Sequence, residues 1–298
     1  TKFVPASGAA SRMFKDMFEF LGAEYDVPTK PFEQKFFENV HNFAFFGDLN
    51  AACEKNNGKG IDALVAEGNY KAVVANLLEG AGLNYGALPK GLLKFHSYED
   101  GVRTPLEEHL VEGALYAAGK TGKVNVHFTV STEHRELFQA LVEEKVAAYA
   151  AKYGVEYLVS FSEQKPSTDT VAADMENKPF RDNGKLLFRP GGHGALIENL
   201  NDLDADVIFI KNIDNVVPDR LKDETVAYKN WLLSKRRHSN TSNCWIALSI
   251  LTNNWKKSSA SYRMTCAAVR MISRIWKMQT WLSTCVRNLT DQCVSAVW

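Results

Sequence analysis

The first 231 residues alternate between short apolar runs and longer stretches whose apolar positions follow a helical spacing. The runs predict β-strands over residues 2–7, 124–130, 155–161, 186–188 and 206–210. The spaced stretches predict helices over residues 11–21, 104–118, 131–153 and 195–202. Strands that alternate with helices pair in parallel through right-handed crossovers. The pattern therefore predicts an α/β fold with a mostly parallel sheet flanked by helices.

Residues 31–80 depart from this alternation. Their aromatic and aliphatic residues recur mostly at steps of three or four, which predicts a helical insertion packed on the core. The helix at 104–118 carries its own start signal, because Thr104 can cap it and Pro105 suits the first helical position. Glu107 and Glu108 favour the positive end of that helix.

Composition changes abruptly near Leu232. Residues 232–298 contain ten Lys or Arg and one acidic residue, Asp291, whereas the preceding part holds 25 basic and 34 acidic residues. All six Trp lie from Trp231 onward, and neither Gly nor Phe occurs after it. A basic tail that binds the phosphates of nucleic acid or lipid is one interpretation, and a disulfide-bonded module is another. The interpretation that we favour is a reading-frame shift near residues 234–237, which leaves residues 232–298 as a tail that is out of frame or disordered.

Several classes of protein are disfavoured. No apolar run approaches the roughly 20 residues that span a bilayer, and residues 1–5 lack the charged and apolar regions of a signal peptide. We therefore expect a cytoplasmic protein with neither a nucleic-acid nor a membrane partner. The histidines and cysteines show no zinc-ligand spacing, and no Ser-His-Asp nucleophile motif occurs.

The first candidate site is the segment PASGAASRM, residues 5–13, at a strand-to-helix turn. The small residues Gly8 and Ala9 let backbone N–H groups approach a phosphate, and the positive end of the following helix attracts its negative charge. The Arg12 guanidinium can donate hydrogen bonds to phosphate oxygens. By itself the segment fits a strand–helix turn with a surface arginine equally well.

Two further segments strengthen the phosphate hypothesis: LPKGLLKF at residues 88–95 and RTPLEEH at residues 103–109. With the first loop they resemble the sugar-phosphate nucleotidyltransferases, which have the nucleotide-diphospho-sugar transferase fold. The resemblance implies that Lys90 is a phosphate-binding cation opposite Arg12. The alternative for Lys90 is a solvated loop lysine.

A third set of segments resembles, in its order, the larger UDP-sugar pyrophosphorylases: FSEQKP at 161–166, FRPGGHGAL at 188–196 and KNIDN at 211–215. The resemblance implies that Gln164 and the backbone of Gly191 and Gly192 bind the nucleobase and ribose. It also implies that Asp214 lies beside the sugar phosphate and Mg²⁺, which agrees with the preference of Mg²⁺ for oxygen ligands. A strand-terminating turn is the alternative for Asp214. Residues 1–231 further resemble a bacterial domain-of-unknown-function family with the same loop, helical insertion and RPGGHG segment.

Together these resemblances imply nucleotidyl transfer from a nucleoside triphosphate to a sugar 1-phosphate, with release of pyrophosphate and with Mg²⁺ as the cofactor. Arg12 and Lys15 would hold the triphosphate, and Lys90 the α-phosphate or the attacking phosphate. The predicted catalytic domain is residues 1–231. A glycosyltransferase that uses a nucleotide sugar and a non-catalytic nucleotide-binding protein are the alternatives.

Overall fold

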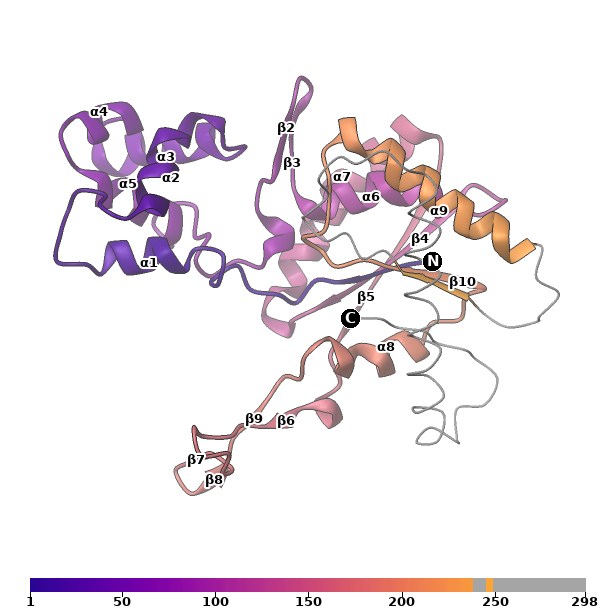
Figure 1. Cartoon of the computed structure of the whole chain (residues 1–298). Coiled ribbons are helices and arrows are strands. Elements are labelled where there is room, and N and C mark those ends of the chain that lie inside the picture. The colour runs from indigo at the N-terminus through magenta and orange to yellow at the C-terminus, as the bar shows by residue number, and fades with distance from the viewer. Residues whose placement is uncertain (238–244, 249–298) are drawn as a thin grey trace, which may run out of the picture.

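A computed structural model of the chain describes residues 1–237 and 245–248. Within that part, five strands form a parallel sheet in the order β11-β10-β1-β4-β5 (Figure 1). Their bounds are Lys2–Pro5 (β1), Lys123–Val130 (β4), Glu156–Glu163 (β5), Val207–Ile210 (β10) and Trp245–Leu248 (β11). The predicted α/β fold with a parallel sheet is confirmed, and the bounds of β1, β4, β5 and β10 lie within two residues of the predicted ones.

Helices cover both faces of this sheet (Figure 1). One face carries α6 (Pro105–Tyr116), α7 (Arg135–Tyr153) and α9 (Lys222–Arg237), and the other carries the short α8 (Ile197–Asn201). The alternation of β4 explains the two layers, because Val126 and Phe128 pack with α6 and α7. His127, between them, stacks on Phe3 of the opposite face with ring centroids 5.6 Å apart. Full burial of a side chain such as Phe128 stabilises the fold by about 1.5–3 kcal/mol.

The start of α6 has the capping arrangement that its sequence predicts. The Thr104 hydroxyl accepts a hydrogen bond from the Glu107 N–H at 3.3 Å, and the Glu107 carboxylate accepts one from the Thr104 N–H at 2.8 Å. Pro105 occupies the first helical position. This reciprocal pair satisfies two N–H groups that the helix leaves unpaired, so it defines where α6 begins.

A helical lobe lies beside the sheet (Figure 1). It includes residues 31–80, where the aromatic spacing predicts an insertion, and also the helix that precedes them. It contains α1 (Lys15–Leu21), α2 (Pro31–Glu38), α3 (Phe46–Asn57), α4 (Ile61–Ala66) and α5 (Tyr70–Leu78). Its helices enclose an apolar core of their own, which includes Met17, Phe20, Leu49 and Leu77. A hairpin of β2 (His96–Tyr98) and β3 (Gly101–Arg103) then leads from the lobe into α6.

Residues 165–192 form an arm that projects from the end of β5 (Figure 1). It is built from β6 (Thr170–Val171), β7 (Arg181–Asp182), β8 (Lys185–Leu186) and β9 (Phe188–Arg189), paired as β6 with β9 and β7 with β8. The predicted strand at 186–188 is therefore wrong as a member of the central sheet. Val171, Met175 and Phe188 are exposed, so apolar character in this segment does not reflect burial.

The compositional change at Leu232 falls inside α9, which continues to Arg237. Beyond α9 the structure describes only β11, which pairs in parallel with β10. The interpretation of residues 232–298 as out of frame or disordered stays a prediction, because residues 238–244 and 249–298 lie outside the described part of the chain. None of the described helices combines the length and apolar character that a membrane span requires.

Candidate functional site

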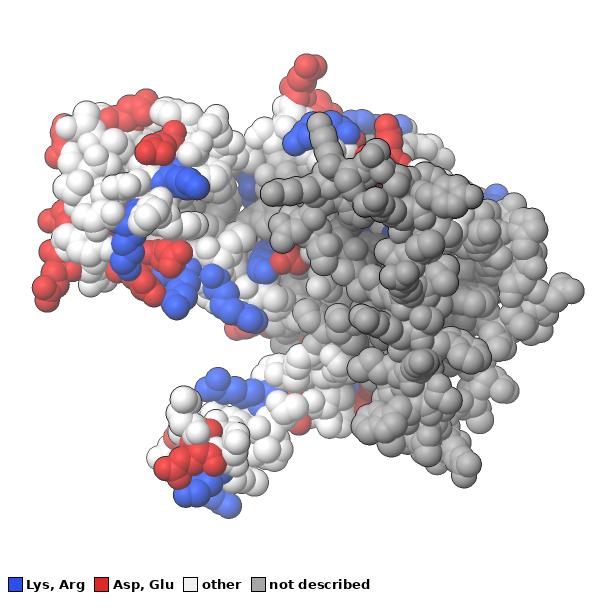
Figure 2. All heavy atoms as spheres, viewed as in Figure 1, with Lys and Arg blue, Asp and Glu red and all other residues white. Residues whose placement is uncertain are grey.

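The carboxyl ends of β1 and β10 lie at the point where the strand order of the sheet reverses. From β1 the chain proceeds outward through β4 and β5, and it then returns to place β10 on the other side of β1. Ligands of open α/β sheets bind outside the carboxyl ends of the strands at such a switch point. On this side the molecule is hollowed between the helical lobe and the arm, and basic side chains gather on both walls (Figure 2).

Three of the predicted segments meet at this edge of the sheet. The Nζ atom of Lys90 donates a hydrogen bond to Oδ2 of Asp214 at 2.6 Å. The Lys90 N–H also donates to the Gly8 carbonyl at 3.1 Å, and the Ala10 N–H donates to the Leu88 carbonyl at 3.3 Å. The Lys90 and Asp214 side chains keep 26% and 34% of their surface exposed. A solvent-accessible cation and carboxylate thus stand beside the small-residue loop that follows β1.

A tight turn carries Asp214. The Asn215 N–H donates to the Asn212 carbonyl at 3.1 Å, which places Asp214 at the third position of a β-turn. The Ile213 N–H donates to the Pro5 carbonyl at 3.1 Å and so connects the turn to the end of β1. The position of Asp214 therefore follows from the pairing of β1 with β10.

Gly91 permits the close packing that places Lys90. A Cβ atom at Gly91 would lie 2.7 Å from the Phe138 ring and 3.0 Å from Cγ1 of Ile213. Both neighbours belong to the buried core between the sheet and the helices of one face. Space favours glycine here, because any side chain would displace the buried Phe138 ring, Ile213 or the lysine segment itself.

We expect Gly91→Ala to lower the free energy of unfolding by about 1–3 kcal/mol, because the added methyl group overpacks this contact. Urea titration followed by circular dichroism measures the change. The control is Gly47→Ala in α3, where a Cβ meets no atom within 4 Å and the helix propensity of alanine favours the replacement. Equal losses in the two variants would show that the contact with Phe138 is not what requires glycine.

Arg12 and Lys15 lie on the surface beyond the loop. Arg12 is exposed and forms no salt bridge within the described part of the chain. Lys15 is 73% exposed, with Nζ 3.7 Å from Oε1 of Glu19. The helix begins at Lys15 and not at residue 11, and residues 11–14 form a turn in which the N–H groups of Met13 and Phe14 both donate to the Ala10 carbonyl. The prediction that a helix N-terminus directly follows the small-residue loop is therefore wrong.

Gln164 and Gly191 come together at the base of the arm. A Cβ atom on Gly191 would lie 3.6 Å from Nε2 of Gln164 and 2.9 Å from the Thr168 carbonyl oxygen. Gln164 Nε2 donates to Oδ1 of Asp169 at 3.3 Å. Gly191 is thus required by the close approach of the two ends of the arm. At Gly192 a Cβ would meet no atom within 4 Å, so space does not explain that glycine.

A polar network that the sequence pattern does not predict holds the base of the arm. The two ring nitrogens of His127 each lie 2.8 Å from a serine Oγ, one of Ser160 and one of Ser162. Asn199 of α8 donates to Ser162 Oγ at 2.9 Å and to the Glu163 carbonyl at 2.7 Å. These bonds tie α8 to the end of β5, directly before Gln164.

The family model that matches the chain is Domain of unknown function (DUF4301), over residues 1–269. The chain belongs to this family. No curated protein and no solved structure matches it. The DUF4301 match agrees with the predicted resemblance to a domain-of-unknown-function family, whereas the pyrophosphorylase-like resemblance stays a prediction.

The DUF4301 chain offers Mg²⁺ a limited set of ligands at this edge. In residues 1–237 and 245–248, no three His, Cys, Asp or Glu side chains gather into a metal-binding group. Asp214 supplies a single carboxylate, of which one oxygen is bonded to Lys90. Such a site suits a Mg²⁺ ion that also has phosphate oxygens as ligands, because Mg²⁺ commonly combines one or two carboxylates with substrate phosphates.

A buried charged cluster of this DUF4301 chain, which the sequence pattern does not predict, lies beneath β1 and β10. The Glu112 carboxylate accepts hydrogen bonds from Nζ of Lys2 at 2.9 Å, from Nζ of Lys211 at 2.5 Å and from the Tyr116 hydroxyl at 3.0 Å. Burial opposes the ionisation of Glu112, but the two lysines outweigh it and hold its pKa well below the usual range. The sequence contains one signal for this burial: Glu112 follows the apolar residues of α6, and each lysine lies next to an apolar strand.

Lys229 of α9 adds an unpaired amine to this cluster. Its side chain is fully buried, and its Nζ has no hydrogen-bond partner among the residues that the structure describes. Nζ lies 5.5 Å from the centroid of the Phe209 ring. Burial, assisted by the charges of Lys211 and Lys2, lowers the pKa of Lys229 from 10.5 to about 7. Burial also lowers the pKa of Lys2 to about 7, although Glu112 opposes this shift.

The stability of the DUF4301 chain should therefore rise with pH between about 7 and 9.5. In that window the unfolded state still protonates Lys2 and Lys229, whose ordinary pKa is 10.5, whereas the folded state has released these protons. Above pH 10 the unfolded tyrosines ionise first and oppose the trend, because burial raises the pKa of Tyr149 and Tyr157 in the folded state.

We expect Lys229→Met to raise the free energy of unfolding at pH 7 by about 1–3 kcal/mol and to reduce its slope against pH. Methionine fills a similar volume without a buried amine. Urea titrations at pH 7.0, 8.0 and 9.0 measure both quantities, with exposed Lys178→Met as the control. An unchanged slope would show that Lys229 does not lose its proton on folding.

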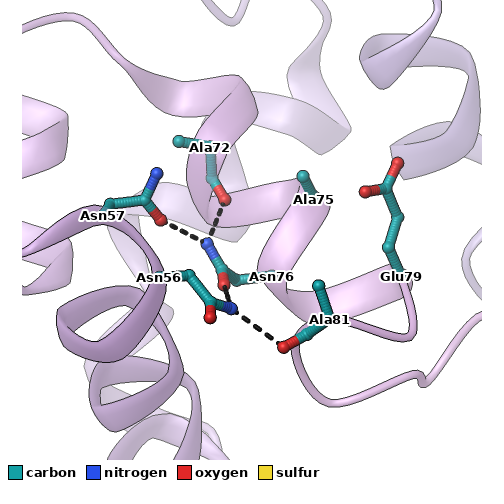
Figure 3. A pocket seen from close by; sticks show the side chains of 7 residues that line it. All are labelled: Asn56, Asn57, Ala72, Ala75, Asn76, Glu79 and Ala81. Carbon is teal, nitrogen blue, oxygen red and sulfur yellow. Dashed lines mark hydrogen bonds between the residues drawn. The ribbon is translucent and has the colours of Figure 1, made fainter.

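The surface depression between α3 and α5 is a weaker candidate site (Figure 3). The Asn76 amide donates to Oδ1 of Asn57 at 2.7 Å and to the Ala72 carbonyl at 2.8 Å, and its oxygen accepts from Asn56 at 2.6 Å. Because these amides bond to each other, they join α3 to α5 and leave few groups for a ligand. The sheet edge remains the candidate site of this DUF4301 chain.

Proposed function

We propose that this protein is a nucleotidyltransferase that joins a sugar 1-phosphate to a nucleoside triphosphate and releases pyrophosphate. The observation that carries the proposal is the hydrogen bond between Lys90 and Asp214 beside the Gly8 loop, at the switch point of the sheet. This bond favours a positioned lysine over a solvated loop lysine, because it joins Lys90 to a residue that is 124 positions away in the sequence.

The proposed reaction depends on charge neutralisation and positioning more than on proton transfer. Phosphoryl and nucleotidyl groups carry negative charge that cations must stabilise as the attacking and leaving oxygens align. Lys90 holds the α-phosphate or the attacking phosphate, and this phosphate competes with Asp214 for the amine. Arg12 and Lys15 are exposed, so both can reach the outer phosphates, Lys15 by exchanging its surface contact with Glu19 for a phosphate. The backbone at Gly8 leaves open space for a phosphate.

The other end of the nucleotide belongs at the base of the arm. The Gln164 amide can pair with the edge of a nucleobase, since it both donates and accepts hydrogen bonds. The open backbone at Gly192 can approach the ribose, and Gly191 keeps this loop beside Gln164. Asp214 is the carboxylate that would hold Mg²⁺, and Mg²⁺ supplies neutralisation of the triphosphate charge.

Product analysis of the purified full chain tests this proposal. The chain is incubated with Mg²⁺, a panel of nucleoside triphosphates and a panel of sugar 1-phosphates, and pyrophosphate and nucleotide sugar are quantified. We expect the two products in equal amounts from one preferred pair of substrates. In a parallel incubation with nucleotide sugars, release of a nucleoside diphosphate would instead indicate a glycosyltransferase. Nucleotide binding without any turnover would indicate a non-catalytic protein, and either result would overturn the proposal.

A further inference from the structure

His109 of α6 contacts the turn that carries Asp214. Its Nε2 atom lies 3.1 Å from the Asn212 carbonyl oxygen and 3.2 Å from the Ile213 carbonyl oxygen. These are the carbonyl groups of the two residues directly before Asp214. The His109 side chain is completely buried, so the contact is part of the packed interior and not a surface encounter.

The chemistry of this contact requires one tautomer of His109. Both neighbours of Nε2 are carbonyl oxygens, which only accept hydrogen bonds, so Nε2 must carry the proton. Burial, together with the nearby Lys2 and Lys211, lowers the pKa of His109 well below its ordinary value, which leaves the ring neutral. Nδ1 is then an acceptor, and no described residue donates a hydrogen bond to it.

The unpaired Nδ1 atom indicates what the imidazole contributes. An aliphatic side chain would fill the same space without a buried unpaired nitrogen, which is unfavourable because the nitrogen has lost its hydrogen bonds to water. The compensating gain is the Nε2–H donor. Within the described part of the chain no other donor reaches the Ile213 carbonyl, whereas the Asn212 carbonyl also accepts from Asn215. Loss of the imidazole would therefore leave the Ile213 carbonyl without a hydrogen-bond donor from the described residues.

We infer that His109 is a positioning residue whose Nε2–H donor holds the 212–215 turn, and thereby the Asp214 carboxylate, against Lys90. The hydrogen bonds that carry this inference do not depend on the reaction. Its consequence for turnover rests on the proposed function, since Asp214 and Lys90 act there on phosphate and metal.

Three variants separate the donor from the volume of the ring. His109→Gln places an amide nitrogen as far along the side chain as Nε2, so it restores the donor. His109→Asn carries the same amide one carbon shorter, near the place of Nδ1, and cannot reach the carbonyl groups. His109→Leu fills space without a donor, and His41→Leu removes an exposed histidine of the helical lobe as a control.

The first readout needs no activity. The side-chain ¹³C resonance of Asp214 and the side-chain resonances of Lys90 are recorded by NMR below the melting temperature of each variant, assigned with Asp214→Asn and Lys90→Ala. We expect His109→Asn and His109→Leu to shift or broaden both sets of signals, while His109→Gln and His41→Leu retain the wild-type signals. Wild-type signals in all four variants would overturn the inference, as would equal perturbation in His109→Gln and His109→Asn.

The second readout is kinetic. If the wild type performs nucleotidyl transfer, kcat should fall about 10- to 100-fold in His109→Asn with a smaller change in KM, because misplacement of a catalytic group affects the transition state most. His109→Gln should recover most of this loss. A wild type without any transfer activity would refute the proposed function and leave the NMR result to decide the role of His109.

Discussion

Lys90→Ala is expected to lower the rate of nucleotidyl transfer by about 10²–10³-fold while leaving the stability of the fold nearly unchanged. A preorganised donor aimed at developing charge is worth this much in enzymes that act on anionic transition states. The ion pair with Asp214 is partly exposed, and such pairs contribute little to stability because solvent screens them. Initial rates of pyrophosphate release give kcat and kcat/KM, and urea titration gives the stability.

Lys94→Ala is the matched control for this variant. Lys94 lies four residues further along the chain and also pairs with an aspartate, Asp48 of the helical lobe. Among the described residues its side chain forms an ion pair with Asp48 and none with the loop after β1 or with β10, so its loss should leave turnover unchanged. A similar loss of rate in both variants would mean that the net positive charge of this segment, and not the position of the Lys90 amine, supports the reaction.

Glu112→Gln is expected to lower the free energy of unfolding by about 3–5 kcal/mol, the usual effect of removing one partner from a buried ion pair. Glu112 is fully buried between Lys2 and Lys211, and its replacement leaves two buried amines without a counter-charge. Urea titration at pH 6, below the pKa of about 7 that Lys2 has in the folded state, measures the loss. Glu19→Gln is the matched control, because Glu19 also faces two lysines, Lys15 and Lys30, but on the exposed surface.

If Glu112→Gln does not fold, simultaneous replacement of Lys2, Glu112 and Lys211 by methionine should recover folding, because it removes both partners of each buried ion pair. A loss in Glu112→Gln no greater than that in Glu19→Gln would contradict the role assigned to the cluster. Failure of the methionine variant to fold would show that the cluster is needed for more than charge balance.

The candidate site was predictable where it depends on strand ends. The carboxyl ends of parallel strands share one edge of a sheet, so a loop after the strand at 2–7 and a turn after the strand at 206–210 lie on the same side. Lys90 connects the two only in the tertiary structure, because Gly91 packs against Phe138 and Ile213 and so places Lys90 at this edge. The late start of α1 was not predictable from spacing, because the turns at Ala10 follow a pattern that also fits a helix.

Local patterns alone determined which segments form β1, β4, β5 and β10 and where α6 begins, because strand alternation and helix capping act between residues a few positions apart. The tertiary structure alone decided the partners of the charged residues. Glu112 meets Lys2 and Lys211 across 110 and 99 residues of sequence, and His109 meets the Asp214 turn across more than 100. The sequence does not distinguish a charged residue in solvent from one in the core. Only the packing of α6 against β1 and β10 determines which charged side chains are buried and which partners they bind.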